Sequence, residues 1–314
     1  MATILITGGT GLIGASLTEL LLSKGHKVII LTRNLKMAID KQSADERLTY
    51  ARWNAEEQSI DRDAIEKANY IVHLAGAGVA DKRWTSKRKK EIVQSRIQSS
   101  GLLIKALKDI PNNIKAVVSA SAIGWYGPDA IPPVRPGGFT ESDPSDKAFL
   151  GETCRWWEES IQPVTELGKR LIKFRFGIVL ANDGGALAEF KKPVQFGIAS
   201  ILGNGKQVVS WIHIDDVCRL IVYAIENDKI EGVYNAVAPN PVTNKNLTLH
   251  LAQRMRGKSF IAVHVPSWVL STMLGGMSTE VLKSATVSAE KMQQTGFQFL
   301  YPQIDAALNE LIKR

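Results

Sequence analysis

A glycine-rich run near the amino terminus constrains the fold more than any other feature of the sequence. It reads Thr7-Gly-Gly-Thr-Gly-Leu-Ile-Gly14 and fits two spacings, Gly9-x-Gly11-x-x-Gly14 and Gly8-x-x-Gly11-x-x-Gly14. A β-branched apolar segment precedes the run and a helical pattern follows it, which indicates a strand–turn–helix unit. Backbone amides and a helix amino terminus in such a turn attract a pyrophosphate, and the last glycine lets the helix pack closely on the strand. We expect a dinucleotide site rather than an ordinary glycine turn, with contacts from Gly8, Thr10, Gly11, Leu12, Ile13 and Gly14.

Short apolar segments alternate with helical patterns over residues 1–180. The predicted strands are Thr3–Thr7, Lys27–Leu31, Tyr70–Leu74, Ile114–Ala120 and Leu171–Phe176. The clearest predicted helices are Leu12–Lys24, Lys87–Lys108 and Leu150–Leu167. Nearly continuous apolar strands separated by helices are typical of a parallel sheet covered on both faces. With right-handed crossovers, this pattern predicts a doubly wound α/β domain of the Rossmann type.

Residues 181–314 follow a looser pattern, which predicts a smaller, mostly helical substrate lobe that shares part of the sheet. The predicted strands are Val208–Ile214 and Val233–Ala236, and the predicted helices are Asp215–Glu226, Asn246–Met255, Ser267–Leu274, Ser278–Ser284 and Ile304–Ile312. Before this lobe, residues 128–147 contain five of the twelve prolines and two adjacent glycines. Because these residues disrupt regular elements, we expect a long loop there.

The residues after the second predicted strand distinguish between the two nicotinamide dinucleotides. An NAD site carries an acidic residue there, which accepts a hydrogen bond from the ribose 2′-hydroxyl. This chain has Leu31-Thr-Arg-Asn34 instead. An arginine can bind a 2′-phosphate through two hydrogen bonds. We therefore expect NADP(H) as the cofactor, with Arg33 as the main contact and Thr32 or Asn34 assisting; the alternative is a solvated surface arginine.

Charge favours an anionic partner without identifying it. The 39 basic and 31 acidic residues give a formal net charge of +8. A phosphorylated cofactor accounts for this charge as well as a nucleic acid would. Six of the nine residues in Lys82–Lys90 are basic. We interpret this run as the solvated start of a helix rather than a polyanion site, and expect neither a nucleic-acid nor a membrane partner.

The cysteine content and the hydropathy exclude several further classes of protein. Cys154 and Cys218 are too few for a disulfide framework or a four-cysteine zinc site, and reduced thiols are expected in the cytoplasm. No run of eighteen apolar residues occurs, and the apolar amino terminus lacks the basic segment of a signal peptide. The histidines do not have metal-ligand spacing, so no metal is expected.

Further motifs follow one another along the whole chain. They are Leu31-Thr-Arg33, His73-Leu-Ala-Gly76, Ser119-Ala-Ser-Ala-Ile-Gly-Trp-Tyr-Gly127, Trp211-Ile-His-Ile-Asp-Asp216, Tyr234-Asn-Ala-Val-Ala-Pro239 and Thr295-Gly-Phe-Gln-Phe299. Together with the glycine-rich run, they resemble the extended short-chain dehydrogenase/reductase superfamily. Within it they resemble the atypical epimerase/dehydratase branch that includes the human family 39U protein, some of whose members carry a cell-division-inhibitor label. This set of motifs is specific for the branch, but it says much less about which reaction the protein catalyses.

The resemblance implies further cofactor contacts. Leu74, Ala75 and Gly76 would lie beside the adenosine half of the cofactor. Glu91 and Arg96, on the next helix, would lie near the cofactor, and Arg175 would be another contact. Glu91 and Arg96 are five positions apart, so they do not share a helix face as an i,i+4 pair does. An exposed helix surface is the alternative for these two residues.

The proton-transfer pair of the superfamily is missing. Most members carry Tyr-x-x-x-Lys on the helix after the fifth strand, where the lysine lowers the pKa of the tyrosine so that the phenol can exchange a proton. The matching positions hold Phe149 and Thr153. A phenyl ring has no proton to exchange, so another group or a water molecule must supply it.

Ser121 and Tyr126 are the candidate catalytic replacements. Ser119 and Ser121 lie near the position of the carbonyl-orienting serine of the superfamily, although a shift of one residue places Ala122 there. Tyr126 follows in the next loop, where relatives use a tyrosine mainly to shape the turn. The expected substrate pocket is lined by Trp125, Phe149, Trp211 and His213. His213 could bind an anionic group there, or it could pack inside the fold as a satisfied imidazole.

Two functions are consistent with these features. The first is an NADP(H)-dependent oxidoreductase, monomeric or homodimeric, that transfers a hydride to or from an unidentified small carbonyl or alcohol substrate. The second is a non-catalytic NADP(H)-sensing regulatory protein. The missing tyrosine and lysine favour the second, whereas the nucleotide signature and the aromatic residues favour the first.

Overall fold

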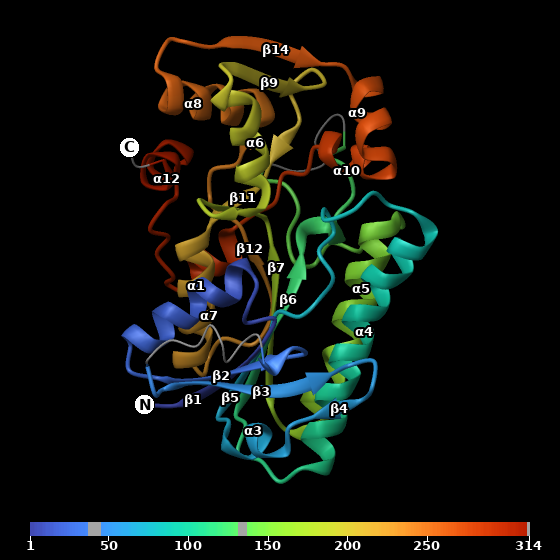
Figure 1. Ribbon diagram of the computed structural model, residues 1–314, viewed down its shortest axis with the longest axis vertical. Helices are drawn as coiled ribbons and strands as arrows, with labels where there is room; N and C mark the ends of the chain where they lie inside the picture. The colour runs from blue at the N-terminus through green and yellow to red at the C-terminus, as the bar shows by residue number, and fades with distance from the viewer. Residues whose placement is uncertain (37–44, 131–136, 313–314) are drawn as a thin grey trace.

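A mostly parallel sheet forms the centre of the computed structural model, which describes residues 1–36, 45–130 and 137–312 (Figure 1). In these ranges the sheet has eight strands in the order β12-β7-β6-β5-β1-β2-β3-β4. They are β1 (Thr3–Thr7), β2 (Lys27–Thr32), β3 (Leu48–Asn54), β4 (Ser59–Ile60), β5 (Tyr70–His73), β6 (Ala116–Ala122), β7 (Arg170–Phe176) and β12 (Gly232–Ala236). Neighbours are parallel except for β3 and β4. The strand order reverses between β1 and β5, and doubly wound folds bind ligands in the crevice at the carboxyl ends of the strands at such a point.

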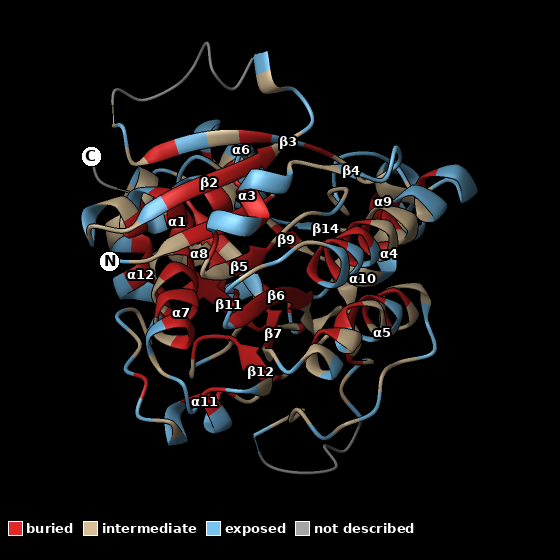
Figure 2. Ribbon diagram, turned by 90° about the horizontal axis from the view of Figure 1, so that it is seen from below, coloured by how far each residue is buried: buried red, intermediate tan, exposed pale blue. Residues whose placement is uncertain are grey.

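Helices cover both faces of this sheet. They are α1 (Leu12–Ser23) and α7 (Ile214–Glu226) on one face, and α3 (Arg62–Lys67), α4 (Ser86–Asp109) and α5 (Phe149–Ile161) on the other (Figure 2). Alternate residues of β1 pack into the two cores on opposite faces of the sheet. Ile4 and Ile6 belong to the core beneath α1 and α7, whereas Leu5 belongs to the core beneath α3 and α4. The prediction of a doubly wound parallel α/β fold is confirmed.

The second half of the chain builds an upper lobe and returns one strand to the main sheet. The helices of the lobe are α6 (Gly185–Gln195), α8 (Asn244–Arg256), α9 (Ser267–Leu274), α10 (Ser278–Leu282) and α12 (Ile304–Leu311), with the 3-10 turn η3 (Gly275–Met277). The short helix α11 (Glu290–Gln294) packs beside β12 of the main sheet (Figure 2). The short strands of the lobe pair as β8 (Ile178–Ala181) with β11 (Trp211–His213), β9 (Ile198–Leu202) with β14 (Ile261–Val265), and β10 (Val208–Val209) with β13 (Val242–Thr243). The lobe thus contains more strand than the sequence pattern predicts.

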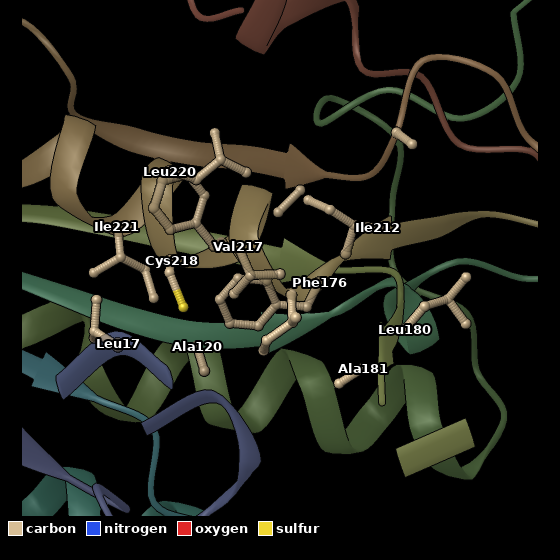
Figure 3. Packing of buried hydrophobic residues seen from close by; sticks show 14 of the residues in the cluster. Leu17, Ala120, Phe176, Leu180, Ala181, Ile212, Val217, Cys218, Leu220 and Ile221 are labelled. Atoms are coloured by element: carbon tan, nitrogen blue, oxygen red, sulfur yellow. The ribbon is translucent and has the colours of Figure 1, made fainter. Parts of the chain in front are cut away.

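One apolar core continues from the main sheet into this lobe. Figure 3 shows Val217 and Leu220 of α7 packed above the sheet, and Leu180 and Ile212 extend the same cluster into the paired strands β8 and β11. Since β12 also belongs to the main sheet, residues 181–314 do not pack as a separate body.

Two segments depart from the predicted secondary structure. The predicted helix over residues 150–167 is α5 followed by a separate 3-10 segment, η2 (Gln162–Leu167), because Pro163 lacks the amide that an α-helix needs at that position. The described part of the proline-rich region contains no helix or strand; residues 131–136 of that region lie outside the described ranges. In the parts of the chain that the structure describes, no helix combines the length and apolar composition needed to span a bilayer.

Candidate functional site: the crevice at the carboxyl ends of β1, β2, β5 and β6

The glycine-rich turn joins β1 to α1. Gly8 has a φ of +69°, and a Cβ atom on it would lie 2.9 Å from the backbone carbon of Leu74. Gly11 is the N-cap residue of α1, and its amide donates to the carbonyl of Gly8 at 3.0 Å. The positive φ and the close approach both require glycine at position 8.

Gly9 and Gly14 bring α1 directly against the turn and β2. A Cβ atom on Gly14 would lie 2.4 Å from the carbonyl oxygen of Gly8, and one on Gly9 would lie 2.8 Å from the Ile30 side chain. The first amides of a helix have no acceptor within it, and Gly11 has no side chain with which to cap them. The turn can therefore receive a pyrophosphate on the amides of residues 12–14, and the residues present fit a dinucleotide. Thr10 is exposed beside this turn.

Basic side chains stand at the carboxyl end of β2 and its neighbour. Arg33 is exposed directly after the strand, and the Thr32 hydroxyl accepts a hydrogen bond from the amide of Asn34 at 3.2 Å. Arg52 on β3 pairs in register with Thr32 and is also exposed, 3.7 Å from Glu57. The sequence pattern did not identify Arg52, because β3 was not predicted. The site therefore offers two guanidinium groups where an NAD-specific fold would carry an acid.

A buried threonine–histidine pair fixes the segment after β5. The Thr7 hydroxyl lies 2.7 Å from His73 Nδ1 and accepts hydrogen bonds from the amides of Leu74 and Ala75, both at 3.2 Å. Burial, with a smaller contribution from the charge of Arg96, lowers the pKa of His73 to about 3. The imidazole is therefore neutral and holds the start of the Leu74–Gly76 segment beside the glycine turn. Sequence reasoning missed this role of His73.

Arg96 supports the same segment from below. Its guanidinium donates to the carbonyl of Ala77 at 3.1 Å and lies 4.6 Å from the ring centre of Trp157. A Cβ atom on Gly76 would lie 3.2 Å from the guanidinium carbon, so the backbone packs closely on it at this glycine. Arg96 is buried, and burial lowers its pKa. The arginine thus positions the loop and is not an exposed helix residue.

Arg88 is buried within the basic run and organises the loop before α4. It donates to the carbonyl of Gly78 and lies 3.2 Å from the Asp81 carboxylate and 2.8 Å from that of Glu91. Glu91 is exposed and pairs with Arg88, not with Arg96. Residues 88, 92 and 96 have the i, i+4, i+8 spacing of a buried helix face. The many basic residues around them made this signal hard to recognise in the sequence.

The hydroxyl of Ser121 is committed to a buried ion pair. Ser121, near the end of β6, donates to Glu158 Oε1 at 2.7 Å. Arg175, its register partner on β7, donates to the same carboxylate at 2.8 and 3.1 Å, and its guanidinium carbon lies 3.6 Å from the Trp125 ring centre. All of these groups except Trp125 are buried. The side chains of Ser121 and Arg175 therefore connect β6 and β7 to α5.

The phenol of Tyr126 belongs to the same buried network. It donates to Asn235 Oδ1 at 2.6 Å and accepts from Arg175 at 3.0 Å. Burial raises the pKa of Tyr126 to about 12, and the residue is fully buried. This environment opposes ionisation, and it matches the turn-shaping alternative better than proton donation to a substrate in the crevice.

Phe149 and Thr153 occupy the first turns of α5. The Phe149 ring meets Trp84 edge to face, with the centroids 5.0 Å apart, and Thr153 is buried with its hydroxyl donating to the carbonyl of Phe149 at 2.6 Å. The neighbouring Cys154 is buried, and burial raises its pKa to about 12, so it is not a reactive thiolate.

Trp211 and His213 lie inside the upper lobe and not with Trp125 and Phe149. Both are fully buried. His213 Nδ1 accepts the amide of Asp215 at 3.0 Å and so caps α7, while Nε2 lies 3.2 Å from Glu310. His213, Asp215 and Glu310 each bring a possible metal-ligating atom within 4.8 Å of the others, and the cap of α7 and the His213–Glu310 contact account for this grouping. The four expected lining residues thus form two separate groups.

Comparison with known proteins agrees with this architecture. The model of the NAD-dependent epimerase/dehydratase family matches residues 4–147 and 189–236, and a domain of unknown function, DUF1731, matches residues 265–311. An epimerase family protein of Staphylococcus aureus strain NCTC 8325 is 35% identical over 316 residues and covers 100% of both chains.

Solved structures share the fold along the whole chain. Human epimerase family protein SDR39U1, crystallised with NADPH, has a TM-score of 0.84 and 27% identity, with 98% of each chain covered. UDP-glucuronic acid 4-epimerase from Bacillus cereus, in complex with UDP-glucuronic acid and NAD, has a TM-score of 0.78 at 19% identity, covering 98% of this chain and 96% of that one. Since the family model spans more than half of the sequence and a relative is 35% identical from end to end, the chain belongs to the NAD-dependent epimerase/dehydratase family.

Proposed function

We propose that this protein is an NADP(H)-dependent oxidoreductase that acts on a small carbonyl or alcohol substrate without a tyrosine–lysine pair. When bound, the nicotinamide supplies or accepts the hydride. The chain's own residues bind the pyrophosphate on the turn of residues 8–14, bind the 2′-phosphate through Arg33, and hold the adenosine side with Leu74–Gly76.

The observation that carries the proposal is the exposed Arg33 at the end of β2, next to a glycine cradle that Gly8 and Gly14 make possible. Arginine repels no phosphate and can bind one through two hydrogen bonds, whereas NADH offers it only a hydroxyl. The complex of the human relative with NADPH supports the same preference.

The proton in this proposal comes from an ordered water molecule. Ser121 is buried and its hydroxyl donates to Glu158, while the Tyr126 hydroxyl donates to Asn235. Neither group has a free proton directed at the crevice, and Phe149 has none to give. Of the three candidate donors, a serine, Tyr126 and water, only water can give a proton without breaking the buried network.

A second candidate is a non-catalytic NADP(H)-sensing protein. The replacement of the tyrosine and lysine by Phe149 and Thr153 favours it, together with the engagement of both alternative hydroxyls. In that case the cofactor is a ligand whose redox state changes a surface recognised by a partner.

Two measurements separate these functions. Calorimetric titration with NADPH and NADH tests the cofactor, and tight binding of NADPH alone is the expected result. NADPH oxidation is then followed at 340 nm with a broad carbonyl panel, for the wild type and for Gly11→Asp, which places a negative charge in the pyrophosphate cradle. Faster oxidation by the wild type supports the enzyme. Tight binding with no acceleration by any carbonyl supports the sensor, and absence of heat with either nucleotide overturns both.

A further inference from the structure

A lysine lies on an aromatic corner at the junction of the two lobes. Trp84, before α4, and Phe149, at the start of α5, have ring centroids 5.0 Å apart at 71°. The ammonium of Lys89 lies 4.9 Å from the Phe149 centroid and 5.7 Å from that of Trp84. The Trp84 indole donates to the carbonyl of Val79 at 2.9 Å, which fixes its orientation. We call these three side chains the Lys89 corner.

The upper lobe closes over this corner. A Cβ atom on Gly276 would lie 3.8 Å from the Trp84 ring, and one on Gly275 would lie 2.7 Å from Arg83 Nε. In Figure 1, α9 and α10 lie above the amino-terminal ends of α4 and α5. Because α4 and α5 follow β5 and β6, their amino-terminal ends, and the corner with them, lie at the edge of the sheet where the strands end, which is the edge where small molecules bind in doubly wound folds.

The charge of Lys89 is not matched by a carboxylate. The nearby acids Asp81 and Glu91 pair with Arg88 instead, and in the described ranges no acidic group lies within ion-pair distance of the Lys89 ammonium. Aromatic faces attract the ammonium electrostatically, but they do not accept its three N–H groups as oxygen atoms would. The side chain is only partly exposed, so an anion that reached it would lose little of its attraction to screening by water.

We propose that Lys89 binds the carboxylate of the substrate, so that the substrate is a small carbonyl acid or the corresponding hydroxy acid. This inference rests on the proposed function and specifies the substrate class of the same site. One ammonium matches one negative charge, whereas a phosphate dianion is typically held by several cations or by an arginine fork. The rings of Trp84 and Phe149 suit the apolar remainder of such an acid, and the exposed Lys82 and Arg83 attract anions toward it.

The test compares an acid with its neutral ester. Benzoylformate and methyl benzoylformate are titrated by tryptophan fluorescence into the protein saturated with NADP+, which cannot reduce them. Phenyl phosphate is the third probe. The variants are Lys89→Met, Lys89→Arg and, as the matched control, Lys90→Met, which removes the same charge from an exposed neighbour.

The wild type and Lys90→Met are expected to bind the acid at least about tenfold more tightly than the ester, as a charge-assisted hydrogen bond predicts. Lys89→Met should abolish that preference with an unchanged Kd for NADP+, and Lys89→Arg should keep part of it. Equal binding of acid and ester by the wild type, tighter binding of phenyl phosphate, or an equal loss of NADP+ affinity in Lys89→Met would each overturn the inference. If NADP+ does not bind at all, the proposed function fails, and the same titrations on the protein alone still decide whether Lys89 selects carboxylates.

Discussion

The guanidinium of Arg175 donates two hydrogen bonds to the carboxylate of Glu158, at 2.8 and 3.1 Å, and both residues are buried. The pair joins β7 to α5, and Ser121 adds β6 through its bond to the same carboxylate. The charges compensate one another away from water, so removing one partner leaves the other without a counter-ion. Arg175 therefore stabilises the packing of β7 against α5, in addition to any contact that it makes with a cofactor.

Glu158→Leu is expected to lower the free energy of unfolding by about 3–5 kcal/mol, because it strands the buried charge of Arg175. Urea denaturation followed by circular dichroism measures the loss. Glu159→Leu is the control on the same helix, since Glu159 pairs with Arg155 in a more exposed position and should lose less than about 1 kcal/mol. Similar losses in the two variants would contradict the importance of the buried pair.

Gly14→Ala is expected to weaken the binding of both NADPH and NADH by at least about tenfold, equivalent to 1.4 kcal/mol. The added carbon would lie 2.4 Å from the Gly8 carbonyl oxygen, so α1 must move away from the turn. Gly101→Ala is the matched control in a helix, because its added carbon would meet nothing within 4 Å. That variant should bind both nucleotides normally and gain up to about 1 kcal/mol in stability. Normal binding by a folded Gly14→Ala protein would show that the turn is not the cradle.

The central strands and the glycine turn could be predicted because their signals are local. β1 is predicted with its observed bounds, since a buried parallel strand is apolar at nearly every position. β3 was missed because its apolar residues do not form a continuous run, since the exposed Thr49 and Arg52 interrupt it. β14 was also missed; most of its residues are exposed, and its observed partner β9 lies far away in the sequence. The weak strands owe their conformation to partners that lie far away in the sequence.

The residues of the candidate site also differ in whether their roles depend on neighbours in the sequence or on distant partners. The conformation at Gly8 and the position of Arg33 after a strand depend on neighbours in sequence, so both could be anticipated. The contact of Thr7 with His73 joins residues 66 positions apart, and that of Ser121 with Glu158 joins residues 37 apart. Residue type alone made Ser121 a catalytic candidate, whereas its partner decides what its hydroxyl does.

His73 is expected to make stability fall at low pH. Its pKa is about 3 in the folded protein, below the ordinary value of 6.5, so only the unfolded chain binds a proton between these values. Stability from this group is therefore full above pH 6.5 and declines as the pH falls, by about 1.4 kcal/mol per pH unit well below 6.5. Urea denaturation between pH 7.5 and 5 should show a smaller slope in His73→Gln than in the wild type, with the difference approaching one proton toward pH 5. Equal slopes in His73→Gln and in the wild type would contradict the prediction.

Arg33→Asp is expected to weaken NADPH binding by about 30- to 100-fold, the range of a lost charge-assisted hydrogen bond with added repulsion of the 2′-phosphate. NADH should lose less than about threefold, because aspartate can accept a hydrogen bond from its 2′-hydroxyl. Fluorescence titration with each nucleotide measures the two dissociation constants.

Arg62→Asp, which makes the same change of charge on the exposed face of α3, should alter neither dissociation constant. A comparable loss for both nucleotides would mean that Arg33 does not read the phosphate, and an unchanged NADPH affinity would make it a solvated surface residue. A residual preference for NADPH in Arg33→Asp is expected to depend on Arg52, which pairs in register with Thr32, and should disappear when Arg52→Ala is added.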